Sequence, residues 1–142
     1  TMNWEKINPV TNPPIPRSCH AAAVVGNRMY IYGGVSGPGT DTFCDLHEFN
    51  FGPYSSPPAP RFASFIMTFL VDTLEWRPIE STGTLPPAIR CHRLSAVLGK
   101  LILTGGQVPG ILPDDKIWNA LPFVYQLDTS THSFPYFPPP LS

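Results

Sequence analysis

An all-β fold built from repeated antiparallel sheets is predicted by three features of this 142-residue chain. The first is an internal repeat, because Trp4 and the pair Gly33-Gly34 return 72 residues later as Trp76 and Gly105-Gly106. The second is a strand, turn, strand pattern in both copies. The third is the presence of 19 prolines and 11 glycines, which interrupt the chain too often for long helices. A repeated unit of this kind indicates stacked structural modules.

Each copy begins with a predicted β-hairpin after a histidine. In the first copy, strands 21–25 and 28–32 flank Gly26-Asn27, a pair suited to a tight turn. The second copy repeats the pattern with strands 94–98 and 101–104 around Gly99-Lys100.

Two further strands complete each predicted sheet. The third strands are the apolar segments 65–71 and 121–127, closed by Asp72-Thr73 and Asp128-Thr129. The fourth strands, 75–79 and 132–136, carry aromatic residues. Each repeat therefore predicts one four-stranded antiparallel sheet.

The order of arginine, histidine, strand, glycine turn, strand, Gly-Gly, strand and tryptophan resembles the kelch repeat, whose four-stranded sheets are the blades of a β-propeller. The resemblance covers most of the chain. It differs in having a spacing longer than the roughly 50 residues of kelch repeats, and Phe134 where a tryptophan is more usual. It implies about two blades, plus one strand of a preceding blade around Trp4.

The resemblance also implies a domain division and an incomplete ring. Residues 1–16 are expected to form the outer strand of a preceding blade and a linker, 17–80 a first blade with a long insertion at 35–64, and 81–142 a second blade and a tail. Propellers close with about 4 to 8 blades, and two blades leave apolar faces uncovered. Either the chain is a piece of a longer propeller, or further copies or a partner chain complete the ring.

The repeated residues are expected to have structural roles. The glycine pairs end the second strand where space is short or positive φ is needed, and the tryptophans pack between blades. The histidines and arginines hydrogen-bond backbone groups where blades meet, since a catalytic residue is rarely needed once per blade. The set is Trp4, Arg17, His20, Gly33, Gly34, Trp76, Arg90, His92, Gly105 and Gly106.

Composition excludes several classes of protein. The net charge is -1 with 13% charged residues, so no broad electrostatic field marks a nucleic-acid or membrane-surface binder. The longest apolar run, 65–71, is far shorter than the roughly 18 residues of a membrane helix. Three cysteines predict reduced thiols in an intracellular protein, cytoplasmic or nuclear, with a single disulfide as the alternative.

No metal, cofactor or catalytic site is expected. Cys19-His20, Cys91-His92 and Cys44 suggest zinc ligands, but neighbouring residues of a strand point to opposite faces and no Cys-x₂₋₄-Cys spacing is present. The chain has no Gly-x-Ser-x-Gly elbow and no phosphate-binding glycine loop. Some kelch proteins are copper or iron enzymes, but the Glu-x₃-Asp-x₃-His motif of the iron-using specifier proteins is absent. A fragment of a kelch-fold metal enzyme remains an alternative.

Two long links are the candidate partner-binding segments. Both are expected at the same edge of the propeller, because both are expected to join a second to a third strand. The first contains a proline-rich tract that serves as a spacer or as a polyproline ligand. The second contains Trp118, either a partner anchor or a side chain folded back on its blade. The candidate contact residues are Arg61, Asp114, Asp115, Lys116 and Trp118.

A narrower resemblance concerns about a third of the chain. Residues 116–128, preceded by 83–90, resemble the kelch propeller subunit of the V(D)J recombinase and its transposon relatives. This would imply an accessory subunit that meets DNA only through a recombinase, with arginines such as Arg61, Arg77, Arg90 and Arg93 near phosphate. The primary prediction is a non-enzymatic kelch scaffold that presents edge loops to a protein partner.

Overall fold

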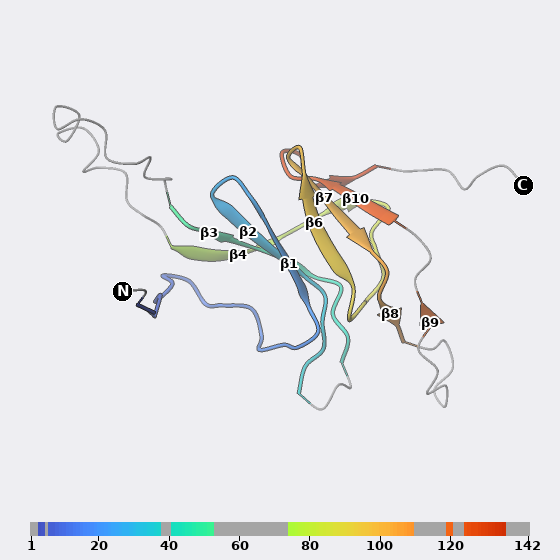
Figure 1. Ribbon diagram of the computed structural model, residues 1–142, viewed down its shortest axis with the longest axis horizontal. Coiled ribbons are helices and arrows are strands. Elements are labelled where there is room, and N and C mark those ends of the chain that lie inside the picture. The colour runs from blue at the N-terminus through green and yellow to red at the C-terminus, as the bar shows by residue number, and fades with distance from the viewer. Residues whose placement is uncertain are drawn as a thin grey trace, which may run out of the picture.

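The computed structural model describes residues 3–4, 6–37, 41–52, 74–109, 119–120 and 124–135. Strands, turns and extended segments make up this part of the chain, and no helix occurs in it. The all-β prediction is therefore confirmed. Two larger sheets lie next to each other, with a two-stranded ribbon beside the second (Figure 1). Within the same residues, no helix is long and apolar enough to cross a membrane.

The first sheet contains four antiparallel strands in chain order. They are β1 (Ala21–Val25), β2 (Arg28–Tyr32), β3 (Leu46–Asn50) and β4 (Glu75–Ile79). The predicted limits of the first, second and fourth strands agree with the structure residue for residue. The apolar runs on either side of the Gly26-Asn27 turn placed the first two strands, and an aromatic segment placed the fourth.

The third strand of this sheet was predicted wrongly. The structure places β3 at Leu46–Asn50, between β2 and β4, whereas segment 65–71 lies outside the described residues. The cause is Glu48, a charged residue on the core-facing side of β3, which hides the apolar alternation of a half-buried strand. Segment 35–64 is thus not one insertion. Residues 33–45 join β2 to β3, and residues 51–74 join β3 to β4.

The second sheet has five strands in the order β5-β11-β10-β7-β6. Leu98 belongs to the hairpin turn with φ of +49°, so the strands of this hairpin begin one residue earlier than predicted. The short β5 was not predicted and pairs in parallel with β11. The strands are β5 (Thr82–Gly83), β6 (Arg93–Val97), β7 (Lys100–Thr104), β10 (Val124–Asp128) and β11 (Ser133–Phe134), and the ribbon is β8 (Gln107–Val108) with β9 (Asn119–Ala120).

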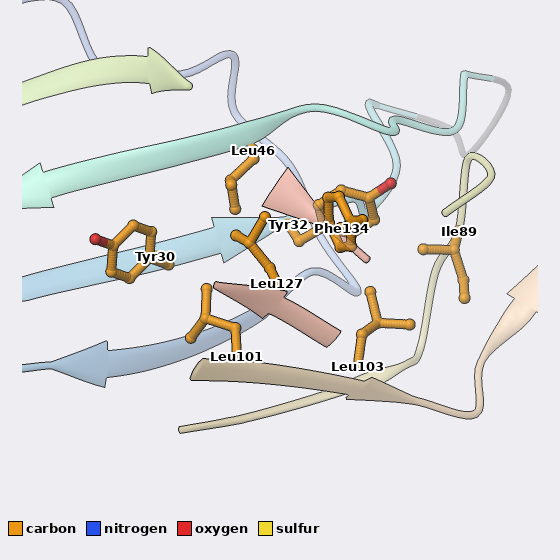
Figure 2. Close-up of a cluster of buried hydrophobic side chains, with 8 residues drawn as sticks. All are labelled: Tyr30, Tyr32, Leu46, Ile89, Leu101, Leu103, Leu127 and Phe134. Carbon is orange, nitrogen blue, oxygen red and sulfur yellow. The ribbon is translucent and has the colours of Figure 1, made fainter. Parts of the chain in front are cut away.

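The core lies between the two sheets, in the interface that we call the seam. Three side chains come from the first sheet, four from the second, and one from the crossover between them (Figure 2). The crossover residue, Ile89, is completely buried. The cluster consists of Tyr30, Tyr32, Leu46, Ile89, Leu101, Leu103, Leu127 and Phe134.

Equivalent strands of the two sheets turn opposite faces toward the seam. Tyr30 of β2 belongs to the core, and Leu101 of β7 does as well. In the 72-residue register, however, Tyr30 corresponds to Ile102 and Leu101 to Met29, and strand alternation points these two side chains away from the seam. In a sandwich related by a twofold axis, both copies would turn the same side inward. The two sheets instead follow one another like successive blades of a ring.

The N-terminal segment runs beside the edge of the first sheet. Residues 3–4 and 6–16 contain no strand, although a strand of a preceding blade was expected around Trp4. The amide of Val10 donates to the carbonyl of Leu74 at 2.8 Å, and the Thr11 hydroxyl accepts from the Trp76 amide at 2.6 Å. The division into 1–16, 17–80 and 81–142 stays a prediction.

Candidate functional site

One end of the seam has the same local structure in both copies, and we call it the inner end. Ser18 bridges Val35 in the first copy, and Arg90 bridges Gln107 in the second, again 72 residues apart. The two copies are joined there by a hydrogen bond from the Cys91 amide to the Cys19 carbonyl at 2.9 Å. The structure therefore aligns Arg90 with Ser18, so that Arg90 and Arg17 differ by one position.

The first glycines of the two pairs differ in what surrounds them, whereas the second glycines, Gly34 and Gly106, are crowded in both copies. Gly33 has φ of +63°, and a Cβ added to it would lie 2.5 Å from the Ile89 carbonyl oxygen and 3.0 Å from the His92 ring. Gly105 has nearly the same φ, +64°, but an added Cβ would meet no atom within 4 Å. Positive φ thus explains glycine in both copies, and crowding across the seam adds to it only at Gly33.

The repeated histidines also differ. His92 is 8% exposed, and its ring contacts the Tyr32 ring edge-on with centroids 5.8 Å apart. Burial disfavours the charged imidazole and lowers the pKa of His92 below its ordinary value. His20 is exposed. Of the two equivalent histidines, only His92 packs against the other sheet, and only His92 is buried.

The tryptophans do not lie at the seam. Trp76 packs against Phe49 of its own sheet with ring centroids 4.9 Å apart, and Trp4 is fully exposed. Both lie away from the core cluster of the seam, and packing of the tryptophans between blades stays a prediction.

Arg17 organises one end of the first sheet. Its guanidinium donates two hydrogen bonds to Asp45, at 2.5 and 2.9 Å, and a third to the Gly33 carbonyl at 3.0 Å. Its side chain is only 3% exposed and lies over the Phe43 ring. His47 Nε2 lies 2.8 Å from Asp45 Oδ2. Burial alone would raise the pKa of Asp45, but the hydrogen bonds from Arg17 and His47 outweigh it and hold the pKa below its usual value.

A cavity of about 140 Å³ opens between the two sheets beside Asp45. Its walls are apolar, with Leu46 and Ile79 from the first sheet and Phe134 from the second. The Tyr32 hydroxyl donates to the Pro86 carbonyl at 2.9 Å, and burial raises the pKa of Tyr32. Polar groups at the cavity come from Cys44, Asp45 and Ser81, and exposed apolar surface from Leu85.

A buried charge cluster lies farther along the core-facing side of the first sheet. The Glu48 carboxylate is 1% exposed and accepts hydrogen bonds from Arg77 at 2.8 Å and Arg28 at 3.3 Å. Burial and hydrogen bonding to Glu48 raise the pKa of Tyr30 to about 12. Sequence analysis missed this cluster, because its members are adjacent only across paired strands. The signal that was available is a single charged residue between Leu46 and Phe49.

The candidate contact residues Arg61, Asp114, Asp115, Lys116 and Trp118 lie outside the described residues. The links 35–64 and 107–120 were predicted to share an edge. This holds for the described part of the first link before β3, and it is wrong for the part after β3, to which Arg61 belongs. Phe51 hydrogen-bonds Asn27 at the hairpin-turn end of the first sheet, whereas β8 and β9 follow Gly105-Gly106 at the opposite end (Figure 1). The reason is that residues 51–74 connect a third strand to a fourth.

The described residues contain no cluster of three or more histidine, cysteine, aspartate or glutamate side chains arranged to hold a metal ion. Cys19, Cys44 and Cys91 are free thiols and all are exposed. The pairs Cys19-His20 and Cys91-His92, which suggest zinc in the sequence, place one histidine in the seam and the other at the surface.

Comparison with known proteins finds similarity to kelch repeats and to proteins that contain them. Residues 16–51 match the Kelch motif family. The chain is 35% identical to human Host cell factor 2 over 82 residues, which are 57% of this chain and 9% of that protein. It is 29% identical to rat Kelch domain-containing protein 3 over 106 residues, 75% and 24% of the two chains. It is also 52% identical to Acyl-CoA-binding domain-containing protein 5 of Arabidopsis thaliana over 48 residues, 33% and 7%. The chain thus spans less than a quarter of the length of these relatives.

Proposed function

We propose that this chain, a kelch-repeat segment, is part of a non-enzymatic β-propeller scaffold that binds a protein partner inside the cell. The observation that carries the proposal is the cavity at the end of the seam. Its surroundings combine apolar walls, an exposed leucine and a carboxylate held in one position, which are the features of a site for a partner's side chain.

The size of the cavity favours a protein partner over a small substrate. Sites for small molecules usually enclose about 300 to 1,000 Å³. The cavity here, at about 140 Å³, suits one inserted side chain. A partner would gain most of its binding energy from such an anchor, with polar contacts around it excluding water.

The walls of the cavity are held rigidly, which suits recognition. Arg17 fixes Asp45 through two parallel hydrogen bonds, and Tyr32 fixes the crossover through the Pro86 carbonyl. A preorganised site loses less side-chain entropy when a partner binds. We therefore place the partner's anchor over Leu85 and Asp45, within reach of both sheets.

The proposed contact surface continues along the edge that carries the cavity. The ribbon β8–β9 and the link 33–45 leave the sheets at this edge (Figure 1). The segment with Asp114, Asp115, Lys116 and Trp118 joins β8 to β9, so these residues remain candidates for the same partner. Arg61 belongs to the segment attached at the opposite end and is assigned to a separate contact.

Further blades are proposed to cover the outward faces of both sheets. Val24, Val97 and Val124 are exposed and alternate with residues that face the seam. β-branched residues on an uncovered sheet face are typical of an incomplete stack. The additional blades are supplied by the same polypeptide or by separate chains. The repeated residues would then make the same contacts at each interface as at this seam.

Substitution of Leu85 tests the partner-binding proposal. Leu85→Arg in the intact protein places a charge at the cavity rim, whereas Leu98→Arg makes the same change at an exposed leucine of the hairpin turn. Affinity purification with quantitative mass spectrometry should show partners that bind the wild type and Leu98→Arg, and that are reduced at least about tenfold in Leu85→Arg. Equal recovery with both variants contradicts a partner site at the cavity.

Two further results would favour the alternative functions. Recovery of a recombinase together with DNA would replace the general scaffold with an accessory recombination subunit. A stoichiometric copper or iron ion in the purified intact protein, with loss of activity on its removal, would replace the scaffold with a kelch-fold enzyme.

A further inference from the structure

Two cysteines that are 72 residues apart lie side by side at the inner end of the seam. Cys19 and Cys91 precede β1 and β6, and these two strands are neighbours in the structure (Figure 1). The Cys91 amide donates to the Cys19 carbonyl at 2.9 Å. The third cysteine, Cys44, has no counterpart in the second copy, where alignment of β3 with β10 gives Pro122 at the equivalent position.

The backbone brings the two thiols within the reach of a covalent bond. With standard bond lengths on either side of the 2.9 Å hydrogen bond, the two Cα atoms are at most about 7 Å apart. Disulfides join cysteines whose Cα atoms are about 4.4 to 6.8 Å apart. The pKa of the Cys91 thiol is raised chiefly by the neighbouring Cys19 thiol, in agreement with this proximity. Both cysteines are exposed and therefore accessible to a small oxidant.

Both cysteines adopt a backbone conformation that is unusual for residues other than glycine. Their φ angles are +55° and +54°, in the left-handed region that L residues with a Cβ avoid. Such conformations persist where the surrounding structure holds them, and they are frequent at functional sites. Here the conformation recurs at both positions.

We propose that Cys19 and Cys91 are a site of reversible oxidation, at which a low-molecular-weight disulfide such as oxidised glutathione links the two blades covalently. The thiolate of one cysteine attacks a sulfur of oxidised glutathione and expels one glutathione thiolate. The second cysteine then attacks the resulting mixed disulfide and expels the other. Two protein thiols lose two electrons and two protons, and one oxidised glutathione becomes two reduced glutathione molecules.

The neighbouring Cys19 thiol affects the reactivity of Cys91. It raises the pKa of Cys91, with burial adding to the shift and the charge of Arg90 opposing it. A smaller fraction of Cys91 is therefore thiolate at a given pH, which slows its attack on a disulfide. The resulting bond would close the chain from residue 19 to residue 91 and oppose separation of β1 from β6.

Peptide mapping of the intact protein tests the site directly. The protein is treated with oxidised glutathione, free thiols are blocked with N-ethylmaleimide, and trypsin is added without reductant. The expected product joins peptide Ser18–Arg28 to peptide Cys91–Arg93, while Cys44 carries N-ethylmaleimide. Glutathione or N-ethylmaleimide on both Cys19 and Cys91 in the folded protein would overturn the proposal, as would a disulfide that contains Cys44.

Two serine variants separate the site from general thiol oxidation. Cys91→Ser should retain glutathione on Cys19 as a stable mixed disulfide, because no second thiol can displace it. Cys44→Ser should form the cross-link as the wild type does. Oxidation should raise the Tm of the wild type and Cys44→Ser by at least about 5 °C, reversibly with dithiothreitol, and leave Cys91→Ser unchanged. A wild-type Tm that does not respond to cross-linking would show that the bond does not restrain the seam.

Discussion

The two copies of the repeat have similar backbone conformations, but they differ in which face packs against the other sheet. In the first copy His20 is exposed and Gly33 is crowded by Ile89 and His92. In the second copy His92 is buried, and Gly105 has open space beside it. Only one of the two residues in each copy therefore contacts the other blade: Gly33 in the first copy and His92 in the second. The difference teaches that this histidine and this glycine act between neighbouring blades, where one blade supplies the glycine and the next supplies the histidine.

A second difference concerns the polar content of the two sheets. The first sheet holds Glu48 on its seam-facing side, paired with Arg28 and Arg77. The equivalent of Glu48 in the second sheet is Gln126, which pairs with Ile102 on the outward side. The repeat thus specifies the backbone of each blade but allows a different interface on each side of it.

The largest expected effect comes from the two glycines. Gly33→Ala places a methyl group against the Ile89 carbonyl and adopts an unfavourable φ, so the free energy of unfolding should fall by about 3 kcal/mol or more. Gly105→Ala meets only the backbone penalty and should lose about 1 to 2 kcal/mol. Urea denaturation of the 142-residue chain measures both. In an intact ring completed by further blades, as proposed above, Gly105 would also face a neighbouring blade, and the two losses should become equal.

The next effect concerns the buried carboxylate. Glu48→Ala removes the partner of two arginines and should lower the free energy of unfolding by about 2 kcal/mol. The loss is smaller than for a fully buried pair, since both arginine side chains are half-exposed and can be hydrated. Gln126→Ala should change stability by less than about 0.5 kcal/mol. A comparable loss from both variants would show that the charge cluster does not distinguish the sheets.

The tryptophans should show a smaller contrast. Trp76→Ala removes the ring that packs on Phe49 and should destabilise the protein by about 1.5 kcal/mol, whereas Trp4→Ala should have almost no effect. Chemical denaturation measures the two losses, and acrylamide quenching reports the exposure of each ring. Strong protection of Trp4 from quenching in the intact protein would show that a preceding blade covers it.

The smallest effect is a pH dependence that belongs to His92. Burial lowers the folded-state pKa of this histidine, so the unfolded chain binds the additional proton as the pH falls. The free energy of unfolding is therefore unaffected by His92 above about pH 6.5 and decreases below that pH, by at most about 1.4 kcal/mol per pH unit.

His92→Gln should flatten the stability profile of the wild type between about pH 5 and 7. Thermal unfolding across this pH range measures the two profiles. An unchanged slope in His92→Gln would assign the pH dependence to another group.

The hairpins could be predicted from sequence because their determinants are local. Strands β1, β2 and β4 are where apolar runs, turn residues and an aromatic segment placed them, and the second hairpin is displaced by one residue at Leu98. The third strand of the first sheet could not be found in this way. Glu48 looks like a surface residue until Tyr30, Arg28 and Arg77 surround it, and these partners are 18 to 29 positions away.

The functional surfaces show the same limit. The repeated histidines and glycines could be identified from their recurrence, but recurrence does not distinguish the buried His92 from the exposed His20. The cavity beside Asp45 and the contact between Cys19 and Cys91 both join residues of different sheets. Neither has a local pattern, because each depends on how one blade is rotated relative to the next.

The sequence by itself determined the all-β class, the repeated unit and most strands, since alternation, turn residues and glycines act over a few positions. Only the tertiary structure decided which strand occupies the third place in the first sheet, which face of each blade is covered, and which cysteines meet. These outcomes depend on packing and pairing between residues that are far apart in the chain. Such contacts stabilise the protein only once the two sheets are packed together.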